Sequence, residues 1–404
     1  MVFVGVDWAE EHHDVCVLKE SGELLAEKRI EDSLAGLERL QELLAAHVED
    51  PSEVVIGIET DRGLLVRGLL ASGYLVYAIN PKSVDRYRDR HGVSGAKSDP
   101  GDARVLADIV RTDRHHHRPI AGDSELAQRV QVLARAHRSL IWTRQRQVNQ
   151  LRNLLREFYP AALNIFGTDL ATPAALAVLS LAPTPERGRT LSRSQIASAL
   201  RRAGRQRGLD TKAAEIQAAL REPQLQLPAR IGQAYGTTVA AMAPILIELN
   251  AQLRHLEAEL AATFEEHPDA EIYRSLPGLG FVLGGRVLAE FGDDRTRFAH
   301  AKARKNYAGT APITKTSGKS RIVLARVVRN RHLADACHLW AFSSITRSPG
   351  ARRYYSALRQ RGKTHNQALR SLANRLVGIL HGCLAHRQPF AEGLAWPAAA
   401  TLAA

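Results

Sequence analysis

The stretch that decides the fold is Val2-Phe3-Val4-Gly5-Val6-Asp7, an apolar strand that ends in a carboxylate. Two further short strands follow it after tight polar turns, and a helix then begins behind a plausible N-cap, Ser33. Strands and helices alternate from there to residue 112. The expected strands are 2–7, 14–19, 24–30, 54–59 and 75–79, with helices at 34–44, 64–70 and 99–110. This order indicates a mixed sheet with helices against it, an α/β domain.

The rest of the chain has the pattern of an all-α protein. Two long helices are predicted at 124–158 and 237–266, and they could pair as an antiparallel or intermolecular coiled coil or belong to an ordinary bundle. Residues 181–212 combine Pro and Gly with Arg and Ser, which is typical of a linker. We therefore expect an α/β domain at 1–115, a long-helix middle at 116–270, a basic helical module at 271–390 and a frayed tail at 391–404.

Composition narrows the class of protein. The 404 residues are 45% hydrophobic, which suits packed cores for two or three domains and argues against disorder. No apolar run approaches the roughly 18 residues of a spanning helix, and the N-terminus lacks the features of a signal peptide. The three cysteines are far apart and fit neither a disulfide framework nor a zinc pattern. We expect a soluble intracellular protein with no membrane partner.

Positive charge is concentrated in two segments. Residues 295–370 hold thirteen Arg and five Lys against one acid, Asp335, a local net of +17, whereas the whole chain carries +13. Residues 111–156 hold a further ten Arg. Such fields bind phosphate backbones through counterion release, and arginine adds bidentate contacts. Nucleic acid is therefore the expected partner, with a merely solvated basic face as the alternative. The candidate contacts in the second segment are Arg135, Arg138, Arg144 and Arg146.

Four carboxylates hold positions suited to metal chemistry. Asp7 and Glu59 each end a predicted strand, where a mixed α/β sheet presents its site. Asp99 and Asp102 are spaced i, i+3, which places both on one side of a helix's first turn. Four converging carboxylates would suit two Mg²⁺ or Mn²⁺ ions about 4 Å apart. Each acid could instead be a helix cap or a strand-end acid. The neighbours that could replace one of them are Glu10, Glu11, Asp14 and Asp61.

A possible phosphate-binding turn lies in the basic C-terminal module. Leu276-Pro277-Gly278-Leu279-Gly280 separates two apolar helical segments and resembles a helix-hairpin-helix turn. In such a turn Gly278 and Gly280 would let backbone N–H groups approach a phosphate. Pro-Gly is also an ordinary turn signal, so both interpretations stay open.

A serine–glycine pair follows in the same module. Gly318-Lys319-Ser320 does not complete a P-loop, because Ile313 stands where that motif needs its first glycine. Ser317, by contrast, precedes Gly318 and has the cations Lys315, Lys319 and Arg321 around it. A serine hydroxyl can attack a phosphodiester when cations stabilise the charge that develops. On chemistry alone, a plain Ser/Gly turn is the alternative.

These pieces together resemble a known family. Gly5-Val6-Asp7, Gly57-Ile58-Glu59-Thr60, Asn80-Pro81 and Lys97-Ser98-Asp99-x-x-Asp102-Ala103 resemble insertion-sequence transposases with a DEDD, RuvC-like catalytic domain, relatives of the Piv-type DNA invertases. The resemblance implies an RNase H-like fold for residues 1–115 and metal ligation by the four carboxylates. It also implies that Ser317, in a Pro-…-Ser-Gly motif that starts at Pro312, is the nucleophile. One departure is the turn Thr60-Asp61-Arg62-Gly63, because many members carry the glycine one residue earlier.

The resemblance predicts a DNA transposase or site-specific recombinase that uses Mg²⁺ and a serine nucleophile. Recombination joins several strands, so we expect a homo-oligomer, a dimer or tetramer, with the long helices as its interface. Family members use a structured non-coding RNA, which implies a guide RNA here and makes 111–156 its candidate cradle. Two alternatives stay open: a Holliday-junction-type nuclease with water as nucleophile, and a non-catalytic nucleic-acid-binding scaffold. The expected location is the cytoplasm of a prokaryotic cell, at the nucleoid.

Overall fold

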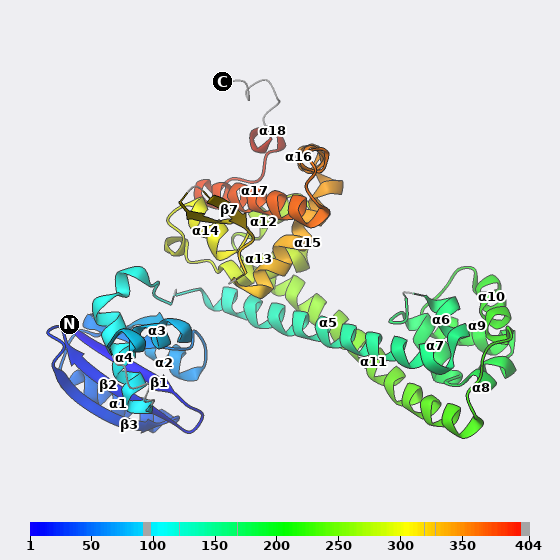
Figure 1. The fold of residues 1–404 in the computed structure, drawn as a ribbon, viewed down its shortest axis with the longest axis horizontal. Coiled ribbons are helices and arrows are strands. Elements are labelled where there is room, and N and C mark those ends of the chain that lie inside the picture. The colour runs from blue at the N-terminus through cyan, green and yellow to red at the C-terminus, as the bar shows by residue number, and fades with distance from the viewer. Residues whose placement is uncertain (92–97, 121, 168, 319, 328, 397–404) are drawn as a thin grey trace. The chain divides into compact units, whose positions relative to one another are not determined.

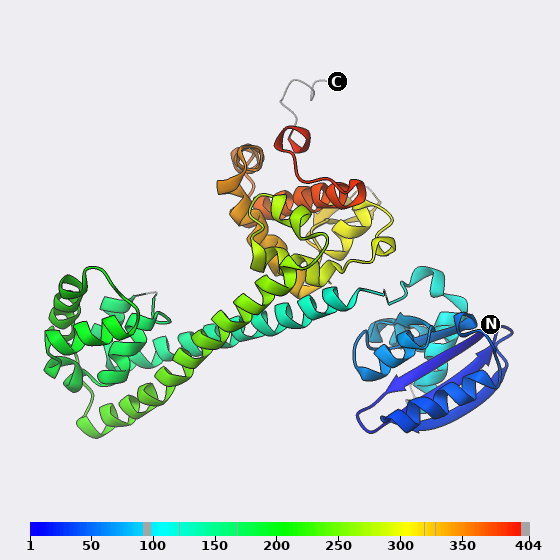
Figure 2. The ribbon, with the colours of Figure 1, turned by 180° about the vertical axis from the view of Figure 1, so that it is seen from behind.

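A computed structural model describes residues 1–91, 98–120, 122–167, 169–318, 320–327 and 329–396 (Figures 1 and 2). The chain divides into two compact units, Met1–Asp123 and Ser124–Ala404. Within the described residues, none of the helices combines the length and the apolarity of a membrane span.

The first unit is built on a five-stranded mixed sheet with the strand order β3-β2-β1-β4-β5. The strands are β1 (Val2–Trp8), β2 (His12–Lys19), β3 (Leu24–Glu31), β4 (Val54–Ile58) and β5 (Leu75–Ala78). β2 lies antiparallel to both β1 and β3, whereas β4 runs parallel to β1 and β5. All of β4 and most of β1 are buried, as expected for strands covered on both faces. The predicted mixed α/β domain is confirmed.

Helices cover both faces of this sheet. Helices α1 (Leu34–Ala45) and α2 (Leu64–Ala71) pack on one face, and α3 (Pro81–His91) and α4 (Asp99–Thr112) pack on the other. Short 3₁₀ turns lie at Pro51–Glu53 and Arg114–His116. The first core includes Val4, Val6, Leu40, Ile56 and Leu69. The second includes Phe3, Val55, Val84, Leu106 and Val110.

Two long helices run through the second unit. α5 (Glu125–Phe158), capped by Ser124, and α11 (Ala229–Glu265) lie side by side (Figures 1 and 2). The contacts His137–Glu257, Arg144–Asn250 and Glu157–Tyr235 make the pair antiparallel, because residue numbers fall along one helix as they rise along the other. The two predicted long helices are therefore confirmed, and they pair with each other within one chain.

Shorter helices pack around the C-terminal half of α5. They are α6 (Pro160–Phe166), α7 (Pro173–Leu181), α8 (Pro185–Thr190), α9 (Arg193–Arg202) and α10 (Leu209–Arg221). Residues 181–212 are thus not a linker, because α8, α9 and the start of α10 occupy them. The proline and glycine residues that suggested a linker instead mark the boundaries of helices. Pro185 is the first residue of α8, and Gly204 and Gly208 take positive φ angles between α9 and α10.

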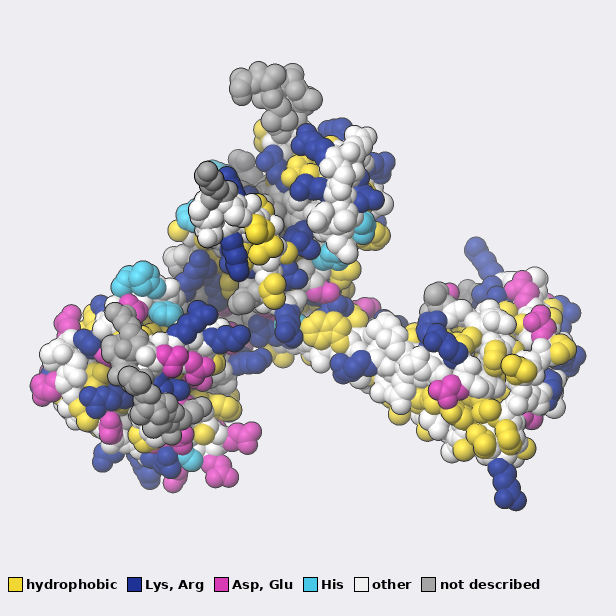
Figure 3. Space-filling view, viewed as in Figure 1, with side chains coloured by type: hydrophobic (Ala, Val, Ile, Leu, Met, Phe, Trp, Pro, Cys, Tyr) yellow, Lys and Arg dark blue, Asp and Glu magenta, His cyan; other side chains and the backbone are white. Residues whose placement is uncertain are grey.

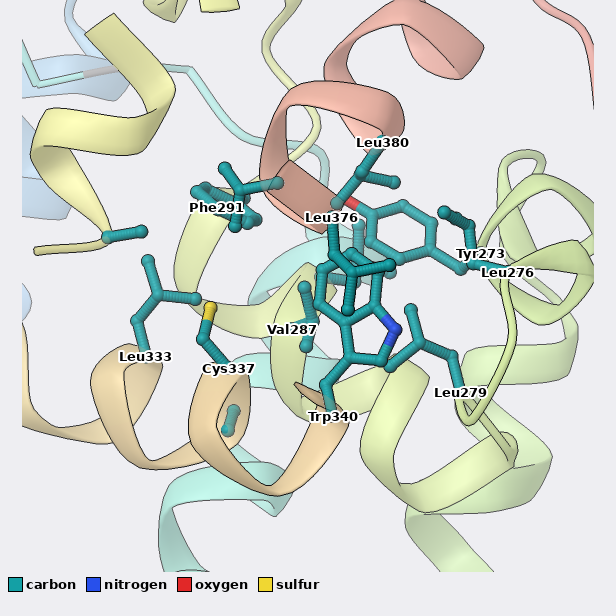
Figure 4. Packing of buried hydrophobic residues seen from close by; sticks show 14 of the residues in the cluster. Tyr273, Leu276, Leu279, Val287, Phe291, Leu333, Cys337, Trp340, Leu376 and Leu380 are labelled. Carbon is teal, nitrogen blue, oxygen red and sulfur yellow. The ribbon is translucent and has the colours of Figure 1, made fainter. Parts of the chain in front are cut away.

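The basic C-terminal helices pack around the other end of the pair. They are α12 (Ala270–Ser275), α13 (Phe281–Phe291), α14 (Ala301–Tyr307), α15 (Arg331–Arg347), α16 (Pro349–Gln360) and α17 (His365–His386), with a 3₁₀ turn at Arg295–Arg297. In their core, Trp340 is fully buried beside Tyr273, Leu279 and Leu376 (Figure 4). The predicted helical module also contains an exposed antiparallel hairpin, β6 (Ile313–Ser317) and β7 (Ser320–Leu324).

The end of the described chain is packed, contrary to the frayed tail predicted from residue 391. Helix α18 (Glu392–Ala395) leads into Trp396, whose ring lies against Gly350 and 5.7 Å from the ring of Tyr354. The Glu392 carboxylate accepts hydrogen bonds from Ser348 Oγ at 2.9 Å and from Gly350 N at 2.7 Å. An aromatic anchor and a helix cap therefore hold residues 391–396, and residues 397–404 lie outside the described residues.

Candidate active site

The ends of two neighbouring parallel strands bring Asp7 and Glu59 together. Asp7 is the penultimate residue of β1, and Glu59 directly follows β4. Val6 pairs with Ile58 in the parallel register, so the next residue along each strand lies beside its neighbour. Both acids are half-buried at this edge of the sheet.

Glycines on the same two strands let α4 approach the sheet closely. A Cβ on Gly5 would lie 1.8 Å from the Ala103 carbonyl oxygen, and one on Gly57 would lie 2.7 Å from the Leu106 carbonyl oxygen. No other residue type fits between backbone atoms at that separation. The first turn of α4, which holds Asp99 and Asp102, is thereby placed against the strands that end in Asp7 and Glu59.

The electrostatics of Asp7 reflect this convergence. Burial, followed by the charges of Asp102, Glu59 and Asp99, raises the pKa of Asp7 from its usual 3.8 to about 6. Like charges raise a carboxyl pKa only when they are close. Asp102, Glu59 and Asp99 therefore all lie near enough to Asp7 to affect its charge, although no three of the four acids are among the described groups whose ligand atoms lie within 4.8 Å of one another. Asp102 is the most buried of them at 5% exposure, and Asp99 is exposed.

Two arginines compensate part of this negative charge. Arg88 on α3 forms an ion pair with Asp102. Arg29 on β3 donates two hydrogen bonds to Asp14, of 3.1 and 2.8 Å, and lies 3.8 Å from Asp99. Sequence reasoning missed both arginines, because nothing local to β3 or α3 links them to acids on other elements.

Asp14, which the sequence indicated only as a substitute ligand, lies beside the predicted acids. It pairs directly with Asp7 across the antiparallel β1–β2 ladder, so the two side chains share a face of the sheet. Ligand atoms of His12, Asp14 and Asp99 lie within 4.8 Å of one another. A polar cluster thus extends from the strand ends over the edge of β2.

The donor set fits a hard divalent cation. The four predicted acids offer only carboxylate oxygens, the ligands that Mg²⁺ and Mn²⁺ prefer. Burial and, after it, the charges of the neighbouring acids raise the pKa of Asp7, and a bound cation would offset that repulsion. Asp7, Glu59, Asp99 and Asp102 are the residues that would hold it.

Ser317 lies at the tip of the β6–β7 hairpin. It is the last residue of β6, is exposed and pairs with Ser320 across the turn, where Gly318 takes a φ of +53°. Lys315, two residues back along β6, shares its face of the hairpin, whereas Arg321 pairs with Thr316 on the other face. Both cations are exposed, and Lys319 lies outside the described residues.

The predicted helix-hairpin-helix turn joins α12 to α13. Gly278 has a φ of +86°, and a Cβ there would lie 2.8 Å from the Ser344 backbone nitrogen on α15. Tight packing therefore explains this glycine, and the neighbouring Pro277 carbonyl accepts the Trp340 indole N–H at 3.0 Å. Gly280 differs: it is exposed, precedes the first turn of α13 and has open space around it.

The four α5 arginines proposed as nucleic-acid contacts have different surroundings. Arg135 binds the buried Glu290 through bonds of 2.9 and 3.0 Å, and Arg138 binds Asp335 at 2.5 Å. Arg144 donates to Asn250 of α11 at 3.1 Å. These three guanidinium groups connect helices inside the unit. Arg146 is exposed and donates to the Thr143 hydroxyl of its own helix at 3.0 Å, so it is the one of the four that faces solvent most openly.

A mixed sheet with acidic residues at its strand ends, joined to a basic helical unit, is the arrangement expected of a DEDD-type transposase. A family model for that domain, described as a transposase, matches residues 4–160. A second model, described as "Transposase IS116/IS110/IS902 family", matches residues 270–356. The first match covers the β-sheet unit and all of α5, and the second runs from the start of α12 into α16.

Full-length relatives agree with these models. The "Mini-circle putative transposase for IS117" of Streptomyces coelicolor is 47% identical over 396 residues, 97% of this chain and 95% of that protein. The IS900 uncharacterized 42 kDa protein of Mycobacterium paratuberculosis is 30% identical over 95% of each chain. The IS110 uncharacterized 43.6 kDa protein of S. coelicolor is 31% identical over 95% of this chain and 94% of that one. The chain belongs to the IS110 family of insertion-element transposases, and its substrate is DNA.

Proposed function

We propose that this transposase cuts and rejoins DNA strands at the ends of its insertion element, with Asp7, Glu59, Asp99 and Asp102 as ligands for Mg²⁺ or Mn²⁺ and Ser317 as the nucleophile. The observation that carries the proposal is the clustering of carboxylates around Asp7, whose pKa is raised to about 6. A carboxyl group with a raised pKa beside other acids at a strand end is typical of a functional site. Arg29 and Arg88, which pair with acids of the cluster, orient its edges.

The proposed strand cut is a transesterification. The Ser317 Oγ–P bond forms, the bond from phosphorus to one strand oxygen breaks, and the serine proton ends on the departing oxygen. The reverse attack by a strand hydroxyl on the phosphoserine rejoins DNA. Bound metal would neutralise the phosphate and favour loss of the serine proton. Ser317 suits this role because it is exposed at a hairpin tip with Lys315 on the same face.

We extend the proposal to a guide RNA and a homo-oligomer. Arg146 and Arg156 are exposed on α5 and could contact RNA phosphates. Ile231, Ile245 and Ile247 on α11 are 49%, 52% and 44% exposed, which supports a contact with a second copy. The α5–α11 pairing uses one side of each long helix within the chain, so an interface between copies would use the remaining surface.

Cleavage of a junction DNA by carboxylate variants tests the proposal. In Mg²⁺, with the element RNA present, Asp7→Asn and Asp102→Asn should each slow strand cleavage by roughly a hundredfold or more, with folding and DNA affinity intact. Glu38→Gln, at an exposed acid on α1, is the matched control and should cleave like the parent protein. If Asp7→Asn cleaves at the parent rate, the acids have only a structural role and the proposal is wrong.

A further inference from the structure

An open cavity of about 510 Å³ lies in the basic C-terminal helices, outside the carboxylate site. Its wall includes residues from α5, from the segment before β6, and from α15 and α17. Arg329, Arg331 and Arg370 line it, together with Asn366 and His338. Lys and Arg side chains gather over this part of the unit, as Figure 3 shows around α16 and α17. The cavity lining itself holds three arginines and one acid, Asp335.

The cavity has one acidic wall residue, Asp335, and this carboxylate is already paired with two arginines. One carboxylate oxygen accepts from Arg138 at 2.5 Å, and the other accepts from Arg286 at 2.6 Å. Arg286 is buried and is not one of the residues that line the cavity. The three arginines of the wall thus leave a net positive charge that Asp335 does not cancel.

The positive ends of two helices meet at the same cavity. Arg331 is the first residue of α15, and Asn366 is the second residue of α17. Both helices are long, so each contributes a helix dipole whose positive end favours an anion. Arg370 adds its guanidinium from the next turn of α17. Two helix N-termini and three arginines around one opening are an arrangement that recognises an oxyanion.

The position of Arg329 is fixed by a glycine. Gly309 takes a φ of +68°, and a Cβ there would lie 2.5 Å from Cβ and from Cδ of Arg329. The arginine stem therefore lies directly on the glycine, and its Nη1 donates to the Arg326 carbonyl at 3.0 Å. A side chain held in this way loses less entropy when it binds an anion.

The titration of His338 is consistent with uncancelled positive charge in the wall. Burial lowers the pKa of His338, Asp335 opposes this effect, and His365, Arg370 and Arg329 lower the pKa further. An anion in the cavity would act in the opposite direction and raise this pKa.

We infer that this cavity binds one backbone phosphate of the DNA strand that Ser317 attacks. Gly309 and Thr310 line the cavity, and Ser317 ends β6 seven residues after Thr310, a span of at most about 23 Å for an extended backbone. A duplex rises about 3.4 Å per step, so the bound phosphate lies within about seven nucleotides of the scissile one. The inference rests on the proposed function only for the identity of that strand; the affinity of the cavity for a phosphate does not depend on the chemistry.

Binding measured without catalysis tests the inference separately from the proposed function. In EDTA, a labelled DNA of the element junction should bind Arg331→Ala and Arg370→Ala about tenfold more weakly than the parent protein. Each variant should also lower the slope of log affinity against log salt by about 1. Arg347→Ala, at the opposite end of α15 and exposed, is the matched control. Unchanged DNA affinity in both cavity variants, or a loss confined to an RNA of the element, would overturn the inference.

Neutral phosphates locate the contact. A set of junction DNAs, each with one methylphosphonate, should contain a position within about seven nucleotides of the cut that weakens binding by the parent protein but not by Arg331→Ala. If every methylphosphonate weakens both proteins equally, the cavity does not contact a particular phosphate and the inference is wrong. Ser317→Ala should give the parent pattern, since the binding site does not need the nucleophile.

Discussion

Replacing Arg135 by alanine tests whether this arginine stabilises the fold or contacts nucleic acid. The Arg135 side chain is 28% exposed, and its partner Glu290 is 3% exposed. The two form a bidentate pair with bonds of 2.9 and 3.0 Å, and Asn330 donates to the same carboxylate at 2.6 Å. Without the guanidinium, the Glu290 carboxylate remains buried and keeps the neutral Asn330 amide as its hydrogen-bond donor. We expect Arg135→Ala to lower the free energy of unfolding by about 3 kcal/mol.

The pH dependence of this loss has a defined sign. Burial alone would raise the pKa of Glu290, but the hydrogen bonds and charge of Arg135, with Asn330, hold it below its usual 4.5. In the parent protein the pair therefore stabilises the fold fully above about pH 4.5 and less as the pH falls through the lowered pKa. In Arg135→Ala, burial raises the pKa of Glu290, so acid relieves the penalty. The stability difference between the two proteins should be largest near pH 7 and should shrink toward pH 4.

The test measures denaturant unfolding and RNA binding for the parent protein and for each variant, on the same samples. Arg146→Ala is the control, because that arginine is exposed and its hydrogen bond is local. It should change stability by less than about 0.5 kcal/mol and weaken nucleic-acid binding instead. An Arg135→Ala protein that keeps its stability within about 1 kcal/mol and loses RNA affinity would refute the structural role of Arg135.

Three further perturbations test the packing and the metal site. Gly5→Ala should destabilise the protein by more than about 3 kcal/mol in denaturant unfolding, because the new Cβ would lie 1.8 Å from the Ala103 carbonyl oxygen. A loss below about 1 kcal/mol would contradict the close approach of α4 to the sheet. Gly278→Ala should cost about 1–3 kcal/mol, whereas Gly280→Ala, with open space around it, should stay near the parent stability; equal losses would show that the α12–α13 turn is not packed as described. Mg²⁺ at a hundred times its Kd should add about 2.7 kcal/mol of stability, an increment that EDTA removes and that Asp7→Asn lacks; an equal increment in both proteins would place the ion elsewhere.

Local patterns in the sequence predicted the first unit well. The alternation of apolar strands and amphipathic helices defines the mixed sheet, and the carboxylates that end β1 and β4 follow from the register of parallel strands. Asp99 and Asp102 join them because Gly5 and Gly57 admit α4 against the sheet. Those glycines were visible in the sequence, but only as parts of motifs.

Long-range pairing is what the sequence could not give. Arg135 and Arg138 belong to a basic segment, and their partners Glu290 and Asp335 lie 155 and 197 residues further along the chain. The composition includes the charge of these arginines but does not show that they form ion pairs inside the protein. The prolines and glycines of 181–212 were misleading for a related reason, since a helix boundary and a linker share the same residues until the packing of α8–α10 is known.

Trapping of a covalent intermediate tests the central claim most directly. The protein is incubated with its element RNA, Mg²⁺ and suicide DNA substrates that carry the element junction and a matching target, and the products are separated on a denaturing gel. The account predicts a protein–DNA adduct that Ser317→Ala abolishes and that Ser320→Ala, its partner across the hairpin turn, retains. Cleaved DNA with no adduct, or an adduct that survives in Ser317→Ala, would contradict the serine mechanism and favour attack by a metal-activated water.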